Sequence, residues 1–219
     1  MKILGQIPIL KVAMTQIILA SGSPRRRELL ARLGVQFRVR SADVDENSTE
    51  PDPQTLVQFL ANKKARAVQM LEPDSVILAA DTVVAFEGQI LQKPVSKLEN
   101  ADFIRTLSGN WHEVFTGVCI LTPSAQALGF ERTRVKFRDL SSAEILGYAN
   151  SGEGLDKAGG YGIQEMGMAL IEKIEGDFFN VVGLPISTML ELAHSLKLEL
   201  LPWVNSEVAW VNSEVAGAD

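Results

Sequence analysis

The sequence contains very little cysteine or histidine and lacks any long hydrophobic run. Cys119 is its only cysteine, so no internal disulfide can form and a reducing compartment is expected. It lies in an apolar stretch, which predicts an inert core thiol rather than a reactive one. Because His112 and His194 are the only histidines, a zinc site of Cys and His ligands is not expected. No apolar run approaches the roughly 20 residues that span a bilayer, so we expect a cytoplasmic protein without a membrane partner.

An excess of positive charge is also absent. The chain carries 21 Lys and Arg residues against 27 Asp and Glu, a formal net charge of -6. This balance argues against a broad nucleic-acid-binding surface, so no stable nucleic-acid partner is expected, although a local basic patch remains open. Apolar residues make up 46% and charged residues 22% of the 219 positions, as in ordinary globular proteins. That length suits one large domain, or one domain with two lobes.

Strand-like and helix-like segments are intermixed along the chain. A hairpin turn is predicted at Glu87-Gly88, and Ser141 with Glu144 forms a capping-box pattern at the start of a helix. Strands are predicted at 16–20, 37–40, 75–80 with its continuation 83–86, 90–91, 114–121, 133–137 and 169–174. Helices are predicted at 24–33, 53–71, 98–107, 141–150 and after Pro185. Hairpins together with crossovers predict a mixed-sheet α/β fold.

The two ends differ from the rest of the chain. Residues 1–15 are expected to form an N-terminal extension before a domain that spans 16–200. The tail, 201–219, contains the heptapeptide WVNSEVA twice, at 203–209 and 210–216. Two short copies are too few for a repeat fold. Because Val, Asn and Ser are weak helix formers, a disordered tail is favoured over a partner-binding helix with valines on one face.

The segment 21–27 combines a turn of small residues with three successive arginines. Ser23 can cap the helix that Pro24 opens. The first turn of a helix carries partial positive charge, so Arg25 and Arg26 are unfavourable there unless an anion binds. Backbone N–H groups and guanidinium groups together suit phosphate oxygens. We therefore favour a phosphate site over a solvated basic helix end.

Carboxylates follow two of the predicted strands. Asp81 ends an apolar strand, and ligands gather at the carboxyl ends of strands in α/β sheets. Taken alone, Asp81 is equally well explained as a turn former. The acidic segment 43–46 offers oxygen ligands for Mg²⁺ or Mn²⁺, although such a cluster is more often a solvated loop.

Lysines and glycines supply the remaining candidates. Lys63 and Lys64 interrupt the apolar stripe of their helix, so at least one is expected beside the core or a cleft, with snorkelling along the helix flank as the alternative. Lys93 precedes a proline and can extend toward the same cleft. The segment 151–164 contains five glycines together with Glu, Asp, Lys and Gln side chains. Glycines permit close approach of backbone to a ligand, so Gln164 and its neighbours are expected to border a site.

Together these segments resemble the Maf family of nucleotide pyrophosphatases over about 17–196. The matching motifs occur in family order: LASGSPRR at 19–26, ADTVV at 80–84, KP at 93–94, SGE at 151–153, DKAGGYGIQ at 156–164 and NVVGLP at 180–185. The resemblance implies a two-lobed, mixed-sheet fold around a central cleft, related to the inosine triphosphate pyrophosphatases. It also implies a divalent cation, Mg²⁺ or Mn²⁺. Whether the protein is a monomer or a homodimer stays open.

The resemblance also implies roles for individual residues. Asp81 matches the catalytic base and a metal ligand, and Asp45 and Glu46 match the acidic pair near the metal. The positions that face the triphosphate are matched by Ser21, Arg26, Lys64 and Lys93. An isolated Asp has a pKa of about 4 and is a weak base at neutral pH, so the metal is expected to acidify the water that Asp81 deprotonates.

One branch of the family acts on dTTP and UTP and another on methylated GTP. The first branch is marked by the residue types found here at Arg25, Thr82 and Gln164, where the second typically has Trp, Gln and Glu. The resemblance therefore implies a dTTP and UTP pyrophosphatase. The alternative is a regulatory protein, related to septum formation, that binds nucleotide without turnover. Retention of Asp81 and the acidic pair favours catalysis, because binding alone has little need for a base.

Overall fold

A mixed sheet of seven strands forms the centre of the protein. The computed structural model describes residues 17–204, and its sheet has the order β2-β1-β3-β5-β6-β7, with β4 paired to β3. β1 is parallel to β2 and β3, and the remaining pairs are antiparallel. The strands are β1 (Ile17–Leu19), β2 (Phe37–Val39), β3 (Val76–Phe86), β4 (Gln89–Leu91), β5 (Trp111–Leu121), β6 (Gln126–Phe137) and β7 (Ile171–Glu175). The predicted mixed-sheet α/β fold is confirmed.

Helices α1 and α4 begin where the capping signals predicted them. Ser23 caps the first helix through the backbone N–H of Arg26, and the capping box of Ser141 and Glu144 is present. The α-helices are α1 (Pro24–Arg32), α2 (Pro53–Gln69), α3 (Lys97–Leu107), α4 (Ser142–Ser151), α5 (Phe178–Val182) and α6 (Ile186–Ser195). Three short 3₁₀ helices are η1 (Glu153–Asp156), η2 (Ala158–Gly160) and η3 (Met166–Leu170).

Strand β3 changes its neighbours along its length, and this change creates an opening in the sheet. Its first part pairs with β1, whose last partner is Leu19 opposite Leu78. Its last part pairs with β4 from Val84 onward. Among the described strands, none pairs with residues 79–83 on that edge. Asp81 lies in this gap, so the sheet topology leaves space for a ligand beside it.

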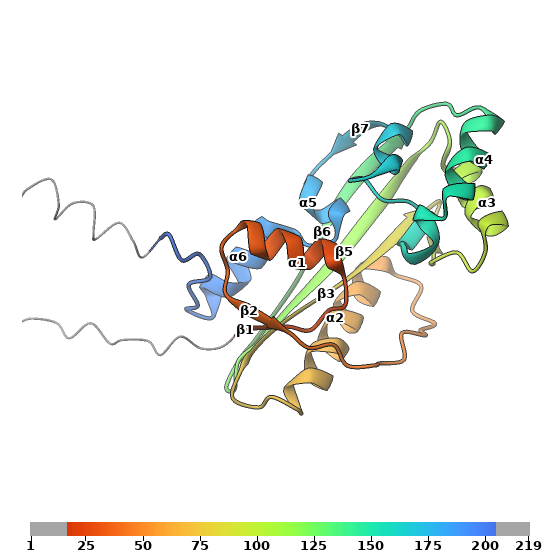
Figure 1. Cartoon of the computed structure of the whole chain (residues 1–219). Helices are drawn as coiled ribbons and strands as arrows, with labels where there is room; N and C mark the ends of the chain where they lie inside the picture. The colour runs from red at the N-terminus through yellow and green to blue at the C-terminus, as the bar shows by residue number, and fades with distance from the viewer. Residues whose placement is uncertain (1–16, 205–219) are drawn as a thin grey trace, which may run out of the picture.

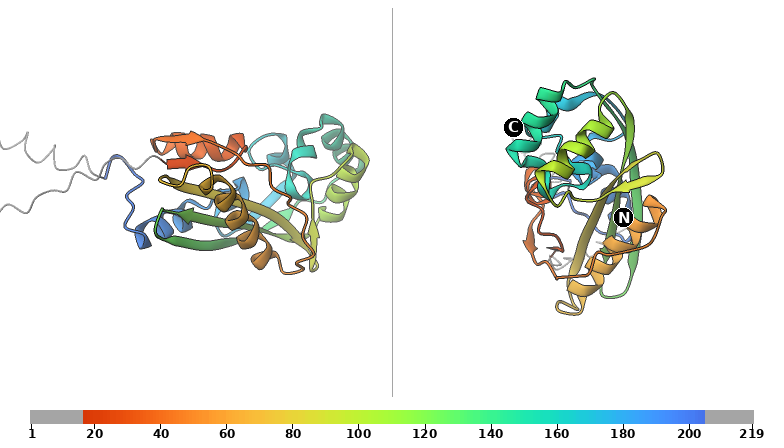
Figure 2. Two further views of the ribbon diagram at one scale, coloured as in Figure 1. Left: turned by 90° about the horizontal axis from the view of Figure 1, so that it is seen from below. Right: turned by 90° about the vertical axis from the view of Figure 1, so that its right-hand side faces the viewer.

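Helices at opposite ends of the sheet form two lobes. Helices α1 and α6 pack against the cluster built on Leu30, Leu78 and Leu184, whereas α3 and α4 pack against the cluster built on Ile104 and Phe137. Figure 1 shows these two helix groups at opposite ends of the long strands, with α5 between them. The expected two-lobed arrangement is therefore confirmed, and the right-hand view of Figure 2 shows α2 apart from α1 and from α3 and α4.

Helix α2 crosses the middle of β3 and β5 at very close range. A Cβ atom built on Gly117 would stand 2.3 Å from the carbonyl oxygen of Val57, so only glycine allows this approach. Beneath the helix, Cys119 is fully buried with Ala61 and Ala79. Burial raises the pKa of the Cys119 thiol to about 12, which confirms the prediction of an inert core cysteine.

Two local predictions needed revision, and one helix was missed. Strands β5 and β6 extend beyond 114–121 and 133–137, because polar residues continue the ladder outside the apolar runs. The glycine-rich segment forms 3₁₀ turns rather than a plain loop. Helix α5 was not predicted, since its five residues are too few to show helical periodicity.

The extension 1–15 and the part of the tail at 205–219 lie outside the described residues. Between residues 17 and 204, no helix is both long enough and apolar enough to cross a membrane.

Candidate active site

A cavity of about 400 Å³ lies between the two lobes, where β3 loses its neighbour. It collects side chains from helix α1, helix α2, strand β3 and the segment after helix α4. The predicted site residues that line it are Ser21, Arg25, Arg26, Glu46, Lys64, Asp81, Thr82 and Lys93. Asp45 and Gln164 are not among the lining residues. The fold thus gathers eight positions from five separate sequence segments into one cleft.

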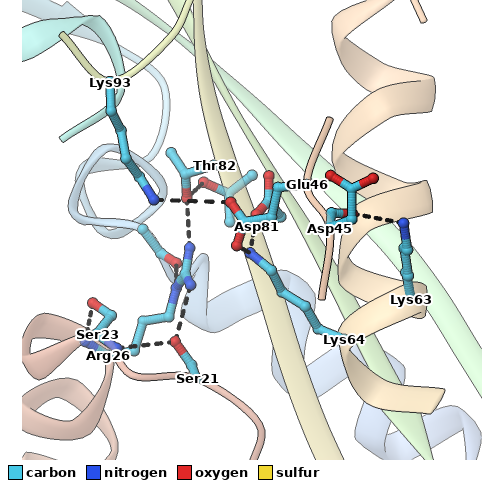
Figure 3. A network of polar contacts seen from close by, with 12 residues as sticks. Ser21, Ser23, Arg26, Asp45, Glu46, Lys63, Lys64, Asp81, Thr82 and Lys93 are labelled. Carbon is cyan, nitrogen blue, oxygen red and sulfur yellow. Dashed lines mark hydrogen bonds and ion pairs between the residues drawn. The ribbon is translucent and has the colours of Figure 1, made fainter. Parts of the chain in front are cut away.

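Asp81 is the buried carboxylate at the centre of the cleft. Only 6% of the residue is exposed. The Lys64 ammonium of α2 forms an ion pair with Asp81 Oδ1 and lies 2.8 Å from Oε1 of Glu46. Figure 3 shows Lys64 reaching between these two carboxylates. One cation therefore contacts both acidic groups.

The surroundings shift the pKa values of Asp81 and Glu46 in opposite directions. Burial raises the pKa of Asp81, and the charges of Lys64 and Arg26 oppose this shift without cancelling it. Partial burial also disfavours the charge on Glu46, but the hydrogen bond and charge of Lys64 outweigh it and lower the pKa of Glu46. Asp81 is consequently a stronger proton acceptor than an exposed aspartate, and Glu46 is held as a carboxylate.

Arg26 is fixed from three sides at the start of α1. Its Nε donates to the carbonyl oxygen of Gly183 at 2.7 Å, Nη1 to Oγ of Ser21 at 3.1 Å, and Nη2 to Oγ1 of Thr82 at 2.9 Å. Burial lowers the pKa of Arg26, with the charge of Asp81 acting in the opposite direction. The guanidinium group lines the cavity, so these bonds orient a cation toward the space where a ligand would lie.

The three residues predicted to set specificity are not all gathered in the cleft. Arg25 of α1 forms a 3.6 Å ion pair with Asp156 of η1, and both residues line the cavity. Thr82 lines the cavity, and its hydroxyl oxygen accepts a hydrogen bond from Arg26. Gln164 is partly buried and follows Ile163, which does line the cavity. Of the three predicted specificity residues, Arg25 and Thr82 therefore line the cavity, and Gln164 is adjacent in sequence to a lining residue.

In each of the two adjacent pairs, Lys63 with Lys64 and Asp45 with Glu46, only the second residue lines the cavity. Lys64 faces the cleft, whereas Lys63 donates to the backbone oxygen of Asp45 at 2.6 Å. The Asp45 carboxylate accepts from the N–H of Asn47 within its own loop. Lys93 is 59% exposed, and its Nζ lies 3.8 Å from Oε2 of Glu46. Glu46 is therefore the member of the acidic pair that lines the cavity.

The glycine-rich segment uses its glycines for packing against protein. A Cβ atom on Gly159 would lie 2.7 Å from the Val84 side chain, and one on Gly154 would overlap the Gly160 carbonyl. Glu153 then fastens the end of the segment by accepting from the N–H of Met166 at 2.8 Å and of Gly167 at 3.0 Å. These two glycines therefore serve packing, while Asp156, Lys157 and Gly162 of the same segment line the cavity, as expected for a segment that borders a site.

Sequence reasoning missed the residues behind Arg26. Thr116 of β5 and Asn180 of α5 are completely buried and hydrogen-bonded to each other. The motif at 180–185 was a visible signal, but it suggested no role for Asn180 or Gly183. Thr116 lies within a predicted apolar strand, where a single threonine is unremarkable.

A buried carboxylate, held beside two cations in a cleft at a sheet gap, defines an enzyme site that handles an anionic substrate. The chain belongs to the Maf family, because the family model described as Maf-like protein matches residues 16–196. Similar curated relatives include the dTTP/UTP pyrophosphatase of Deinococcus radiodurans, 55% identical over 177 residues that cover 81% of this chain and 91% of the relative. The dTTP/UTP pyrophosphatase of Thermus thermophilus is 49% identical, with coverage of 80% and 92%. Among solved structures, the Staphylococcus aureus Ham1 protein matches at 14% identity and a TM-score of 0.41, covering 57% of this chain and 72% of its own.

Proposed function

We propose that the protein is a nucleoside triphosphate pyrophosphatase that hydrolyses dTTP and UTP to the nucleoside monophosphate and pyrophosphate. Such an activity removes excess or non-canonical pyrimidine nucleotides. The observation that carries this proposal is the buried Asp81 carboxylate, ion-paired with Lys64 in a cavity that Arg26 also lines. The relatives that are 55% and 49% identical are dTTP/UTP pyrophosphatases, which supports the same substrates here.

In the proposed reaction, Asp81 accepts a proton from the attacking water. The water oxygen forms a bond to the α-phosphorus, and the bond between that phosphorus and the bridging oxygen breaks. The electron pair leaves with pyrophosphate. The raised pKa of Asp81 improves this carboxylate as a base. The positive charges of Arg26 and Lys64 stabilise the negative charge that develops on the phosphates, and Ser21 and Lys93 complete the proposed phosphate-binding set.

The residues present fit a divalent cation such as Mg²⁺ or Mn²⁺. Asp81 and Glu46 both contact the Lys64 ammonium, so the two carboxylates can share one cation. Residues 17–204 contain no group of three or more His, Cys, Asp or Glu that could hold a metal without help. Mg²⁺ is usually held by one or two carboxylates together with substrate phosphates, and Asp81 and Glu46 match that pattern. When bound, the cation would neutralise phosphate charge.

We retain Arg25, Thr82 and Gln164 as the proposed specificity residues. Arg25 lines the cavity and can exchange its exposed partner Asp156 for a substrate oxygen. The amide of Gln164 offers both donors and an acceptor, which match the imide edge of uracil or thymine. The division into 1–15, 16–200 and 201–219, a cytoplasmic location and the involvement of Asp45 in metal binding likewise remain predictions. The choice between a monomer and a homodimer stays open.

The test is a panel of purified dTTP, UTP, CTP, GTP and methylated GTP with Mg²⁺ or Mn²⁺. We expect release of pyrophosphate, with the highest kcat/KM for dTTP and UTP, and no turnover in excess chelator. Release of orthophosphate alone would exclude cleavage between the α and β phosphates. Tight nucleotide binding without any product would instead favour the regulatory alternative, and full activity in chelator would exclude the metal requirement.

A further inference from the structure

We propose that Thr116 and Asn180, two buried residues behind the cleft, are positioning residues that hold Arg26 ready to bind phosphate. The inference rests on the proposed function, because it assigns a role within the same site. Both residues are 0% exposed, and neither lines the cavity. Their connection to the cleft runs through a chain of hydrogen bonds that ends on the guanidinium group.

The direction of that chain follows from proton counting. A carbonyl oxygen can only accept, so the 3.0 Å bond between Thr116 Oγ1 and the backbone carbonyl of Asn180 uses the single hydroxyl proton of Thr116. The 2.9 Å bond between the two threonine hydroxyls must therefore use the proton of Thr82. Toward the cleft, Thr82 Oγ1 is left as an acceptor, and it accepts from Nη2 of Arg26 at 2.9 Å.

A second connection leads from Asn180 to Arg26 through the backbone of α5. The Asn180 amide nitrogen donates to the Val114 carbonyl and to Oγ1 of Thr133, both at 2.9 Å, which fastens α5 to β5 and β6. The backbone carbonyl of Asn180 accepts from the N–H of Gly183 at 2.9 Å. The Gly183 carbonyl then accepts from Nε of Arg26 at 2.7 Å. Both routes therefore converge on Asn180.

This arrangement determines how much of Arg26 remains for substrate. Three of the five N–H groups of Arg26 are donated to Gly183, Ser21 and Thr82. Within residues 17–204, the other two, one on each terminal nitrogen, have no protein acceptor and can serve phosphate oxygens. It follows that Thr82 acts on phosphate binding by orienting Arg26, since its only proton is committed to Thr116.

The experiment compares Thr116→Val, which keeps the shape but removes the hydroxyl, with Thr116→Ser, which keeps the hydroxyl. Inorganic tripolyphosphate is titrated into each protein by calorimetry, a readout independent of turnover. We expect Thr116→Val to bind about tenfold more weakly, on the order of one hydrogen bond to a charged group, and Thr116→Ser to stay near wild type. With dTTP, KM should rise by a similar factor while kcat changes less than about twofold.

A double-mutant cycle separates positioning from a general structural role. Arg26→Lys keeps the charge, so tripolyphosphate binding stays measurable, but it cannot form the three hydrogen bonds. In that background, Thr116→Val should cost less than about twofold, because the residue through which it acts is already changed. Equal losses in both backgrounds, or unchanged binding in Thr116→Val with an unchanged Tm, would overturn the inference. A wild type that binds tripolyphosphate but does not hydrolyse dTTP would refute only the proposed function.

Discussion

Asp81 and His112 are buried titratable side chains of the same sheet, but charged groups surround only Asp81. Asp81 lies in the cleft, where burial raises its pKa while Lys64 and Arg26 oppose the shift. His112 lies at the start of β5, in the lobe of α3 and α4, where burial alone lowers its pKa to about 3. Its ring packs edge-on against Phe137 and Tyr161.

The difference between the two regions lies in what happens to a charge once it forms. An ionised Asp81 is met by an ammonium and a guanidinium group. A protonated His112 could bond through Nε2 to the Tyr161 hydroxyl at 2.7 Å, but Nδ1 has no partner among the described residues. Burial therefore keeps His112 neutral and structural. Asp81 is buried beside cations that stabilise its carboxylate, so it can ionise and accept a proton.

The largest effect is expected from removing the base in the cleft. Asp81→Asn keeps the shape of the side chain but eliminates its charge and its ability to accept a proton. We expect kcat for dTTP to fall by about 10²–10⁴-fold, as is typical when a general base is lost. Nucleotide binding, measured by calorimetry, should persist because the cations remain.

The matched control is Asp74→Asn, an exposed aspartate before the start of β3 that does not line the cavity. Its kcat should stay within about twofold of wild type, as for a surface change. If Asp81→Asn turned over dTTP nearly as fast as the control, Asp81 would have a structural role like that of His112. The regulatory alternative would then gain support.

A second prediction concerns stability at acidic pH and isolates His112. Its folded-state pKa lies below the ordinary value of about 6.5, so its contribution is fully present above that pH and is lost as pH falls toward the folded value of about 3. At pH 4.5 the loss is on the order of 2 kcal/mol. Urea unfolding at pH 7.5, 6 and 4.5 should therefore show a steeper acid decline for wild type than for His112→Gln.

His194 provides the control for this measurement, because it is exposed near the end of α6. His194→Gln should leave the pH dependence of unfolding as in wild type. The free energy of unfolding of His112→Gln at pH 7.5 is not the deciding quantity, since the substitution also alters packing. Parallel pH curves for wild type and His112→Gln would contradict the neutral assignment of the buried ring.

The contrast between the two regions also explains what could be predicted from sequence. A strand end and a helical stripe are local patterns, and they made Asp81 and one of Lys63 and Lys64 candidates, whose roles the family resemblance then implied. The partners that orient Arg26 are 157 residues away at Gly183 and 56 residues away at Thr82, so no local pattern reports them. Similarly, His112 looked unremarkable in sequence, because its neutral state depends on Tyr161 packing against it from a distant segment.

The acidic loop shows a different limit of sequence reasoning. Asp45 and Glu46 are adjacent and chemically similar, and their loop has neither helical nor strand periodicity to indicate which one faces the cleft. In the structure, Glu46 reaches Lys64, whereas the Asp45 carboxylate accepts a bond within its own loop. Only the path of the chain between β2 and α2 distinguishes them.

The smallest effect is expected from this pair, and it sharpens the comparison by changing the charge around Asp81 without touching the base. In Glu46→Gln the proposed cation loses one of two carboxylates, so the Mg²⁺ concentration for half-maximal activity should rise by about tenfold. Saturating Mg²⁺ should restore most of kcat, because Asp81 and Lys64 remain.

Asp45→Asn is the matched control one position away, and its Mg²⁺ requirement should change by less than about twofold, because its carboxylate does not line the cavity. The measurement is a Mg²⁺ titration of dTTP hydrolysis for the three proteins. Equal shifts in both variants would mean that the loop acts through its total charge, and a larger shift in Asp45→Asn would reverse the assignment of Glu46 as the cleft-facing ligand.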